Sequence, residues 1–446
     1  MTQICLGNAY QGLSDVRDKE ANLVLVIKAY QEALKVYIFD KFPQDYAMTQ
    51  MNLGNAYQGL SDVRDKEANL VLAIRAYQEA LKVYIFDKFP RFYAMTQVNL
   101  GNAYQGLSDV RDKEANLVLA IRAYQEALKV FIFNKFSQDY AKTQMCLGNA
   151  YRSLSEIRDK EGTLELALEA FHESLKIYTF EKFSQDYART QMNLGNAYRD
   201  LSEVRDKEAK LVLAIEAFNK SLKIYTFEKF PQGYAMTQMS LGNAYISLSE
   251  VRDKEANLVL AIEAFNKSLK IYIFDKFPQY YALAQMNLGN AYRRLSEVRD
   301  KEANLVLAIE AFNKSLKIYI FEKFPQYYAM TQVNLGNAYG SLSEVRDKEG
   351  NLALAIKSFH ESLKIYTFEK FPQYYALTHM NLGNAYLILS EARDKESNLE
   401  LVIKAYEEAL KVFTLEKFPQ DYAKIQKNLD FANRSLSELR NRNLNP

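Results

Sequence analysis

Asparagine returns at one position of a segment, Leu-Gly-Asn-Ala-Tyr, that occurs nine times in this sequence. A carboxamide donates and accepts hydrogen bonds at the same time, so an asparagine can pair with the backbone of a peptide of any sequence. Such residues in register would hold an extended chain along a surface. Two alternatives stay open: the asparagines are relics of recent duplication, or each one bonds within its own repeat. We call these residues the asparagine column: Asn8, Asn55, Asn102, Asn149, Asn196, Asn243, Asn290, Asn337 and Asn384.

Three neighbouring positions change their chemistry from copy to copy, whereas the positions of the predicted core stay fixed. They are represented in the second copy by Met48, Gln58 and Gly59. A binding face over a maintained scaffold would show this variation, and drift on an unconstrained surface would look the same. The basic residues at these positions favour a ligand with acidic residues in its middle stretch, and they are Lys142, Arg152, Arg189, Arg199, Arg293 and Arg294.

The residues that most often bind metals or act as nucleophiles are few. Cys5 and Cys146 lie three periods apart at equivalent positions, so we interpret them as tolerated substitutions and not as a disulfide or metal pair. No two histidines share a repeat, which excludes local zinc spacing. No nucleophile–base arrangement stands out, and no glycine cluster could cradle a phosphate. The sequence therefore predicts that this chain is not an enzyme and has no cofactor, no metal and no small-molecule substrate.

The spacing of the repeated segment indicates the architecture that positions these residues. Its glycine recurs every 47 residues from Gly7 to Gly383 without an insertion or deletion, and a tenth copy carries Asp430 instead. A fixed period in this range is typical of a solenoid, in which each unit buries its apolar face against its neighbours. A solenoid presents a long exposed surface, which is suited to binding.

One repeat, residues 43–89, is expected to form two antiparallel helices. Apolar residues at spacings of three and four predict a first helix over about 44–64 and a second helix that ends near 88–89, before a proline. Asp65 is the expected N-cap of the second helix, and the charged run 64–67 is explained by capping and solvated pairing. Gly54 would let the two helices approach closely. The asparagines lie about 160–200° around the first helix from Leu53 and Tyr57, outside the buried stripe.

These residues resemble a known family. Leu53-Gly54-Asn55-Ala56-Tyr57, followed by Ala73, Tyr77, Ala80 and Leu81, is similar to the tetratricopeptide repeat signature, and the resemblance covers essentially the whole chain. The usual period is 34 residues. The longer period here resembles that of bacterial arrays and of kinesin light chains. The resemblance implies an all-α superhelix of helix pairs in which the asparagine face of the first helices lines a concave groove.

The expected organisation is a single solenoid domain over residues 1–446. Residues 1–42 would form a truncated first repeat, residues 43–418 eight full repeats, and residues 419–446 a C-terminal capping helix and tail. We expect nineteen helices, the last from about Pro419 to Leu439. The outer face of that last helix is polar, as in a capping repeat.

Charge and hydropathy narrow the choice of function. With 57 basic and 55 acidic residues the formal net charge is only +2, which argues against an electrostatically driven nucleic-acid binder. No window is apolar enough for a membrane span, and the first residues lack the pattern of a signal peptide, so we expect a cytoplasmic protein without a membrane partner. The leading hypothesis is a non-enzymatic scaffold that binds a peptide segment of a partner protein in the groove. The alternative is a sensing or docking arm of a larger signalling or protease-like assembly, with the effector domain on another chain or missing.

Overall fold

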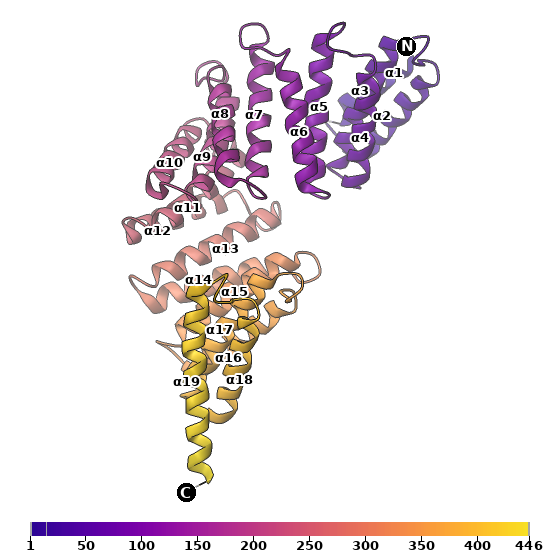
Figure 1. Cartoon of the computed structure of the whole chain (residues 1–446). Coiled ribbons are helices and arrows are strands. Elements are labelled where there is room, and N and C mark those ends of the chain that lie inside the picture. Colours follow the sequence, from indigo (N-terminus) through magenta and orange to yellow (C-terminus); the bar gives the residue numbers. More distant parts are fainter. Residues whose placement is uncertain (1, 15, 445–446) are drawn as a thin grey trace. The chain divides into compact units, whose positions relative to one another are not determined.

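The computed structural model describes residues 2–14 and 16–444, and within these residues it contains nineteen α-helices and no strand. The chain divides into two compact units, Met1–Tyr225 and Thr226–Pro446. Each unit on its own is a stack of helix pairs in which consecutive helices run antiparallel and contact one another (Figure 1). The prediction of an all-α solenoid with nineteen helices is confirmed for the described part of the chain. A single domain over the whole chain stays a prediction.

Odd-numbered helices are the first helices of their repeats, and even-numbered helices are the second helices. The first unit contains the first helices α1 (Thr2–Ser14), α3 (Pro43–Ser61), α5 (Pro90–Ser108), α7 (Ser137–Leu154) and α9 (Ser184–Leu201). Its second helices are α2 (Lys19–Leu34), α4 (Lys66–Leu81), α6 (Lys113–Leu128), α8 (Lys160–Leu175) and α10 (Lys207–Leu222).

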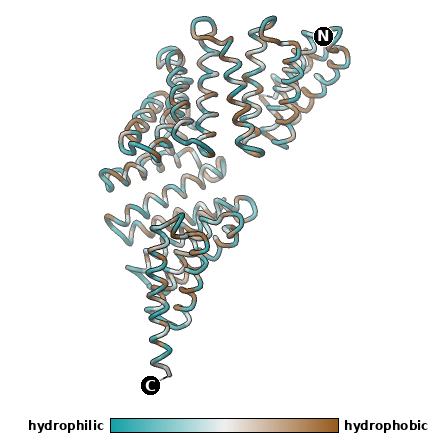
Figure 2. The backbone as a smooth tube through the Cα atoms, in the orientation of Figure 1, coloured by the Kyte–Doolittle hydropathy of each residue, from teal (hydrophilic) through white to brown (hydrophobic). Residues whose placement is uncertain are grey.

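In the second unit the first helices are α11 (Pro231–Leu248), α13 (Pro278–Leu295), α15 (Pro325–Leu342), α17 (Pro372–Ser390) and α19 (Pro419–Leu444). Its second helices are α12 (Lys254–Leu269), α14 (Lys301–Leu316), α16 (Lys348–Leu363) and α18 (Lys395–Leu410). Helix α19 continues five residues beyond the expected end at Leu439. Apolar and hydrophilic segments alternate along the helices of both units (Figure 2), as expected for helices that each bury one side.

The repeated glycine is a packing residue. A Cβ atom built on Gly54 would lie 2.5 Å from Cε1 of Tyr77, the aromatic residue of the second helix in the same repeat. The glycines of the other eight repeats face the corresponding ring in the same way, a tyrosine in three repeats and a phenylalanine in five. The aromatic ring therefore occupies the space that any side chain at this position would need, which confirms the role expected for the glycine.

Consecutive repeats pack through a second apolar interface. In α3, Leu53, Ala56 and Leu60 are 6%, 0% and 4% exposed, and they lie in one cluster with Leu23 and Val26 of the preceding second helix. Within each unit, an inner first helix such as α3 therefore has its own second helix on one side and the preceding second helix on the other. This double coverage is what makes the stack cooperative.

The second helices end earlier than the sequence suggested. Helix α4 ends at Leu81 and not near residues 88–89, and every second helix has the same length of 16 residues. After Leu81 the backbone N–H of Tyr84 still bonds to the carbonyl of Ala80, but the N–H of Ile85 bonds to Val83, which closes a tighter turn. The run Val83 to Phe86 consists of β-branched and aromatic residues, which are weak helix formers. The apolar pattern of the sequence extends beyond the end of α4, because residues 83–86 pack in the turn that follows the helix.

In most repeats the aspartate before the second helix does not act as the expected cap. Asp65 has φ 45° and ψ 49°, in the left-handed region, and its side chain makes no capping hydrogen bond. Aspartate is among the few residues that tolerate this conformation. Only Asp159 and Asp347 accept a hydrogen bond from the helix, in each case from the backbone N–H of a glycine three residues later. A Cβ atom on Gly162 would lie 2.4 Å from the Asp159 carboxylate, so alanine at this position in most other repeats blocks the cap.

The charged run at the turn links consecutive repeats. Arg64 Nη1 lies 2.8 Å from Glu20 Oε1 of the preceding repeat, and Lys66 Nζ lies 2.8 Å from Asp109 Oδ2 of the following repeat. Equivalent pairs recur within both units, for example Lys301 with Glu344. These side chains are about half exposed, so each pair contributes at most about 1 kcal/mol. The run was expected to form solvated pairs, and the structure shows such pairs across the repeat boundary.

Candidate functional site

The asparagine column divides into two groups according to hydrogen bonding. The first group accepts a hydrogen bond at Oδ1 from a tyrosine hydroxyl of the second helix in the same repeat. Tyr77 donates to Asn55 over 2.8 Å, and three further tyrosines donate over 2.7 Å, in the pairs Tyr30–Asn8, Tyr124–Asn102 and Tyr406–Asn384. In these four repeats the asparagine bonds within its own helix pair, which was one of the two alternatives left open by the sequence.

The second group faces a phenylalanine in place of the tyrosine and therefore has no hydroxyl to accept from. Its members are half-buried and make no hydrogen bond to the described part of the chain: Asn149, Asn196, Asn243, Asn290 and Asn337. Each leaves two donors and an acceptor for another molecule or for water. We call these five residues the free asparagines. The first two lie in the first unit and the other three in the second unit.

The sequence contained the signal for this division. The aromatic residue 22 positions after each asparagine is tyrosine in the first group and phenylalanine in the second. The two residues differ by one hydroxyl oxygen. Whether this hydroxyl can donate to the asparagine depends on the distance between the two helices. Because the sequence gives no such distance, the division could not be read from the pattern alone.

Two of the basic residues predicted in the first unit share one carboxylate, which offsets part of their charge. Arg152 Nε lies 2.6 Å from Asp200 Oδ2, and Arg199 Nη2 lies 2.9 Å from Asp200 Oδ1. Arg189 is exposed and lies 3.9 Å from an oxygen of Asp186. Lys142 is exposed and makes no ion pair within the described residues. The positive charge available to a ligand in this unit is therefore smaller than the sequence suggested.

In the second unit one guanidinium is buried without full pairing. The side chain of Arg293 is only 25% exposed, and its Nη1 lies 3.6 Å from Glu297 Oε1. Its Nε has no hydrogen-bond partner. Burial lowers the pKa of Arg293 from its ordinary value, and the Glu297 carboxylate acts in the opposite direction. At the equivalent position of the next repeat Gly340 leaves open space, since a Cβ atom there would meet nothing within 4 Å. Arg294 pairs with Glu250 of the preceding repeat.

The histidines take structural positions. His172 Nε2 lies 3.0 Å from the hydroxyl of Tyr198, where other repeats use glutamine for the same contact. His360 contacts Tyr386 in the same way. Burial lowers the pKa of His379 to about 4, and its ring packs 4.3 Å from that of Tyr375. A neutral imidazole packed against an aromatic ring fits a core residue.

Among the described residues, no group of histidine, cysteine and carboxylate side chains is arranged so that it could hold a metal ion. Burial raises the pKa of the Cys146 thiol to about 11, so this thiol is not activated as a nucleophile. No described helix is both long and apolar enough to cross a lipid bilayer.

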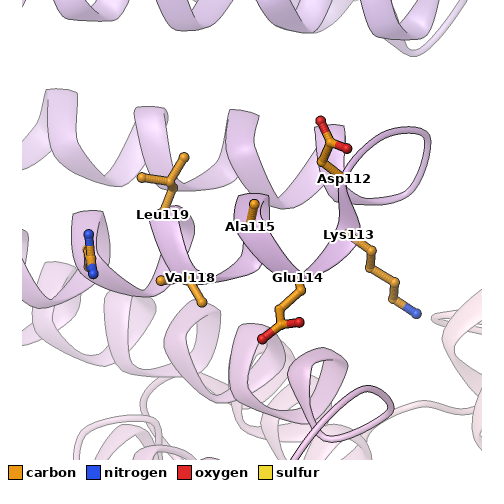
Figure 3. Close-up of a pocket in the computed structure, with 7 residues that line it drawn as sticks. Asp112, Lys113, Glu114, Ala115, Val118 and Leu119 are labelled. Carbon is orange, nitrogen blue, oxygen red and sulfur yellow. The ribbon is translucent and has the colours of Figure 1, made fainter.

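Two hollows lie away from the asparagine column. In the first unit a concavity of about 740 Å³ is lined by charged and apolar side chains of α6 and of the residue before it: Asp112, Lys113, Glu114, Ala115, Val118, Leu119 and Arg122. Figure 3 shows these side chains following one another along the helix surface. In the second unit a cavity of about 220 Å³ is lined mainly by aromatic side chains: Gln326, Tyr327, Met330, Tyr366, Phe371 and Tyr374.

Comparison with known proteins supports the fold. No family model matches the sequence, and a search of curated proteins finds no match. Among solved structures, the chain is similar to the apo form of RapI, with 16% identity and a TM-score of 0.50 over 94% of this chain and 99% of RapI.

Two further structures are similar at lower scores. The C-terminal part of a TPR repeat-containing protein from Cytophaga hutchinsonii has 15% identity and a TM-score of 0.42, covering 70% of this chain and 95% of that protein. The human IFIT1 dimer with m7Gppp-AAAA has 13% identity and a TM-score of 0.45, covering 96% of this chain and 90% of IFIT1. At these identities the likeness concerns the fold. The tetratricopeptide resemblance drawn from the sequence is confirmed at that level.

Proposed function

We propose that this chain is a non-enzymatic scaffold that binds an extended peptide segment of a partner protein along the free asparagines of the first helices within one unit. The observation that carries the proposal is the set of five half-buried carboxamides that make no hydrogen bond within the described residues. A buried or half-buried polar group is normally satisfied, and a peptide backbone offers the donor and acceptor that each carboxamide needs. The free asparagines recur in successive repeats, which suits a ligand with hydrogen-bonding groups at regular intervals. In a peptide these groups belong to the backbone.

Selectivity would come from the variable positions beside the free asparagines. In the second unit the position of Gln58 is occupied by Ile246, Arg293, Gly340 and Leu387. Arg293 brings a half-buried guanidinium, whose side chain is 25% exposed. A carboxylate of the ligand would pair with it at close range, because a guanidinium presents its donors in a fixed fork. The flanking positions favour apolar side chains. The ligand for this unit is therefore an extended segment with an acidic residue between apolar ones.

The test uses the second unit of the intact chain. Peptides are selected against the full-length protein from a phage-displayed library of random sequences, and the best binder is measured by fluorescence anisotropy. Replacing Asn243, Asn290 and Asn337 by alanine removes three potential hydrogen bonds of about 0.5–1.5 kcal/mol each. The affinity should fall by about tenfold or more. Thermal melting should stay nearly unchanged, because these carboxamides bond to nothing in the protein.

Two control variants separate binding from folding. Asn219, Asn266 and Asn313 are exposed on second helices, so their replacement by alanine should leave binding intact. Phe265→Tyr places a hydroxyl where Tyr77 donates to Asn55, and it should weaken binding by occupying Asn243 while preserving the fold. If the triple alanine variant unfolds, the column is structural and the proposal fails. Selected peptides that bind the triple variant as tightly as the wild type would also contradict it.

A further inference from the structure

Three exposed tyrosines occupy the same position in successive first helices of the second unit. They are Tyr280 of α13, Tyr327 of α15 and Tyr374 of α17, and they are 43%, 44% and 51% exposed. We call these three residues the exposed tyrosines. An aromatic residue is not needed to begin a first helix, because most other repeats carry an aspartate at this position: Asp45, Asp139, Asp186 and Asp421.

Each exposed tyrosine stacks on a second tyrosine, which lies in the turn after the preceding second helix. The ring centroids of Tyr366 and Tyr374 are 4.8 Å apart, with 20° between the ring planes. The inner ring is itself fixed, because the Tyr366 hydroxyl donates to the backbone carbonyl of Gln326 over 3.3 Å. The exposed tyrosine is therefore held in a defined orientation while about half of it stays accessible. The other two stacked pairs have centroids 4.7 Å apart, and they are Tyr272–Tyr280 and Tyr319–Tyr327.

Exposed tyrosines of adjacent repeats border one cavity. Tyr327 and Tyr374 line the cavity of about 220 Å³ together with Tyr366 and Phe371, which lie between α16 and α17. Its volume is below the range of about 300–1,000 Å³ that is typical of sites for drug-sized ligands. The described residues that line it include no charged side chain. The cavity therefore suits one or two uncharged side chains of a larger ligand.

Hydrogen-bond donors are available beside these rings. The hydroxyls of the exposed tyrosines make no hydrogen bond within the described part of the chain. Proline has no backbone N–H, so a proline-rich segment offers carbonyl acceptors that find few donors of its own. Grooves lined with aromatic side chains bind such segments in the polyproline II conformation. The exposed tyrosines combine the two features that this ligand needs, rings to pack on and hydroxyls to donate.

We propose that the exposed tyrosines form a docking site for a proline-rich segment of a partner protein in the polyproline II conformation. A proline ring would enter the cavity between Tyr327 and Tyr374, and the hydroxyls would donate to nearby carbonyls of the segment. In this conformation every third residue returns to the same side after about 9 Å. Helices in contact lie about 8–10 Å apart, and α15 contacts both α13 and α17. A proline at every third position would therefore meet one exposed tyrosine after another.

The experiment measures binding of a labelled nonapeptide of Pro-Pro-Ala units to the full-length chain by fluorescence anisotropy. Binding should be saturable, and a Gly-Ser peptide of the same length should not bind. Tyr327→Asp/Tyr374→Asp should weaken binding by about tenfold or more, because it removes two rings of the cavity. Its melting temperature should change little, since the chain carries aspartate at this position in other repeats. Tyr327→Phe/Tyr374→Phe keeps the rings and loses the hydroxyls, so its affinity should lie between those of the wild type and the aspartate variant.

Phe92→Asp is the matched control. Phe92 holds the same position in α5 and stacks on Tyr84 with ring centroids 4.9 Å apart. The adjacent repeats carry Asp45 and Asp139 there, so Phe92 has no aromatic neighbour at this position in the next repeat on either side. This variant should bind the Pro-Pro-Ala peptide as the wild type does.

Several results would overturn the proposal. They are the absence of saturable binding, equal binding of the Gly-Ser peptide, and an unchanged affinity of the aspartate variant. Binding of choline without binding of the proline peptide would also overturn it, because the rings would then hold a quaternary ammonium group.

The site does not depend on the free asparagines. Replacing Asn243, Asn290 and Asn337 by alanine leaves the exposed tyrosines intact, so this variant should bind the Pro-Pro-Ala peptide as the wild type does. Loss of binding in this variant would contradict the proposal, because the peptide would then lie along the asparagines. Failure here is thus distinguishable from failure of the proposed function.

Discussion

At the scale of single residues, close contacts between a glycine and a ring set the distance between the two helices of a repeat. A Cβ atom on Gly289 would lie 2.6 Å from Cε1 of Phe312, which is fully buried. A ring held in a packed core has little room to move. The spacing of each helix pair therefore depends on the missing side chain, and the division of the asparagine column follows from it, since the same spacing brings a tyrosine hydroxyl to the asparagine.

Replacing Gly289 by alanine should destabilise the protein. The added methyl group forces the ring or the helix to move, which costs about 1–3 kcal/mol, and the better helix propensity of alanine returns at most about 1 kcal/mol. Gly340→Ala in the same unit is the matched control, because its Cβ atom meets nothing within 4 Å. That variant should be neutral or up to about 1 kcal/mol more stable. Urea unfolding followed by circular dichroism compares the two, and equal midpoints would contradict the packing role.

At the scale of secondary-structure elements, a short polar bridge fixes the end of some second helices to the start of the first helix in the same repeat. Tyr328 on α15 donates to Glu361 Oε2 of α16 over 2.9 Å, and Lys364 Nζ lies 2.6 Å from Glu361 Oε1. The lysine, and then the tyrosine, lower the pKa of Glu361 from its ordinary value of 4.5, while burial opposes them. Three inner repeats carry a lysine at this position instead: Lys220, Lys267 and Lys314.

The contribution of this bridge should depend on pH in a defined direction. A carboxyl whose pKa is lower in the folded state stabilises the protein above the unfolded value, near 4.5, and this stabilisation is lost as the pH falls through the folded value. We expect Glu361→Gln to lower the melting temperature at pH 6, because glutamine cannot form the ion pair. At about pH 3 the wild-type carboxyl is protonated and resembles glutamine, so the difference should largely disappear. A difference of the same size at both pH values would show that the bridge is not ionic.

The elements were largely predictable from the sequence, and their boundaries and contacts less so. The 47-residue period with apolar residues at helical spacing predicted the helix pairs, and the recurrent Gly54 predicted their close approach. The left-handed backbone conformation of Asp65 and the early end of α4 at Leu81 depend on local dihedral angles. These local preferences compete with tertiary packing. The partners of Arg64 depend on which residues of different repeats lie side by side, and this follows only from the three-dimensional stack.

At the scale of the whole molecule, the order of the repeats determines how much support each helix receives. An inner first helix such as α3 is covered by two second helices, α2 and α4, whereas among the described residues α1 is covered by one second helix, α2. At the other terminal helix, α19 packs on α18 through Ile425 and Leu429 and exposes Lys427 and Asp430 on its other side. In a repeat protein, stability is close to the sum of what each repeat contributes itself and what each interface between neighbours contributes. A repeat that lacks one interface opens at a lower free energy than an inner repeat.

Local opening should therefore be unequal along the chain, and hydrogen exchange measures it directly. We expect residues 2–14 to exchange faster than residues 43–61, although the two helices share most of their sequence, because the leucines of α1 are 37–42% exposed and those of α3 only 4–6%. Leu53→Ala, which weakens the contact between α2 and α3, should accelerate exchange in the first repeat more than in α5. The equivalent change in α1, Leu6→Ala, removes a largely exposed side chain and should have a smaller effect. Slower exchange in residues 2–14 than in residues 43–61 would contradict this account, because it would mean that coverage by the preceding second helix does not set the stability of a first helix.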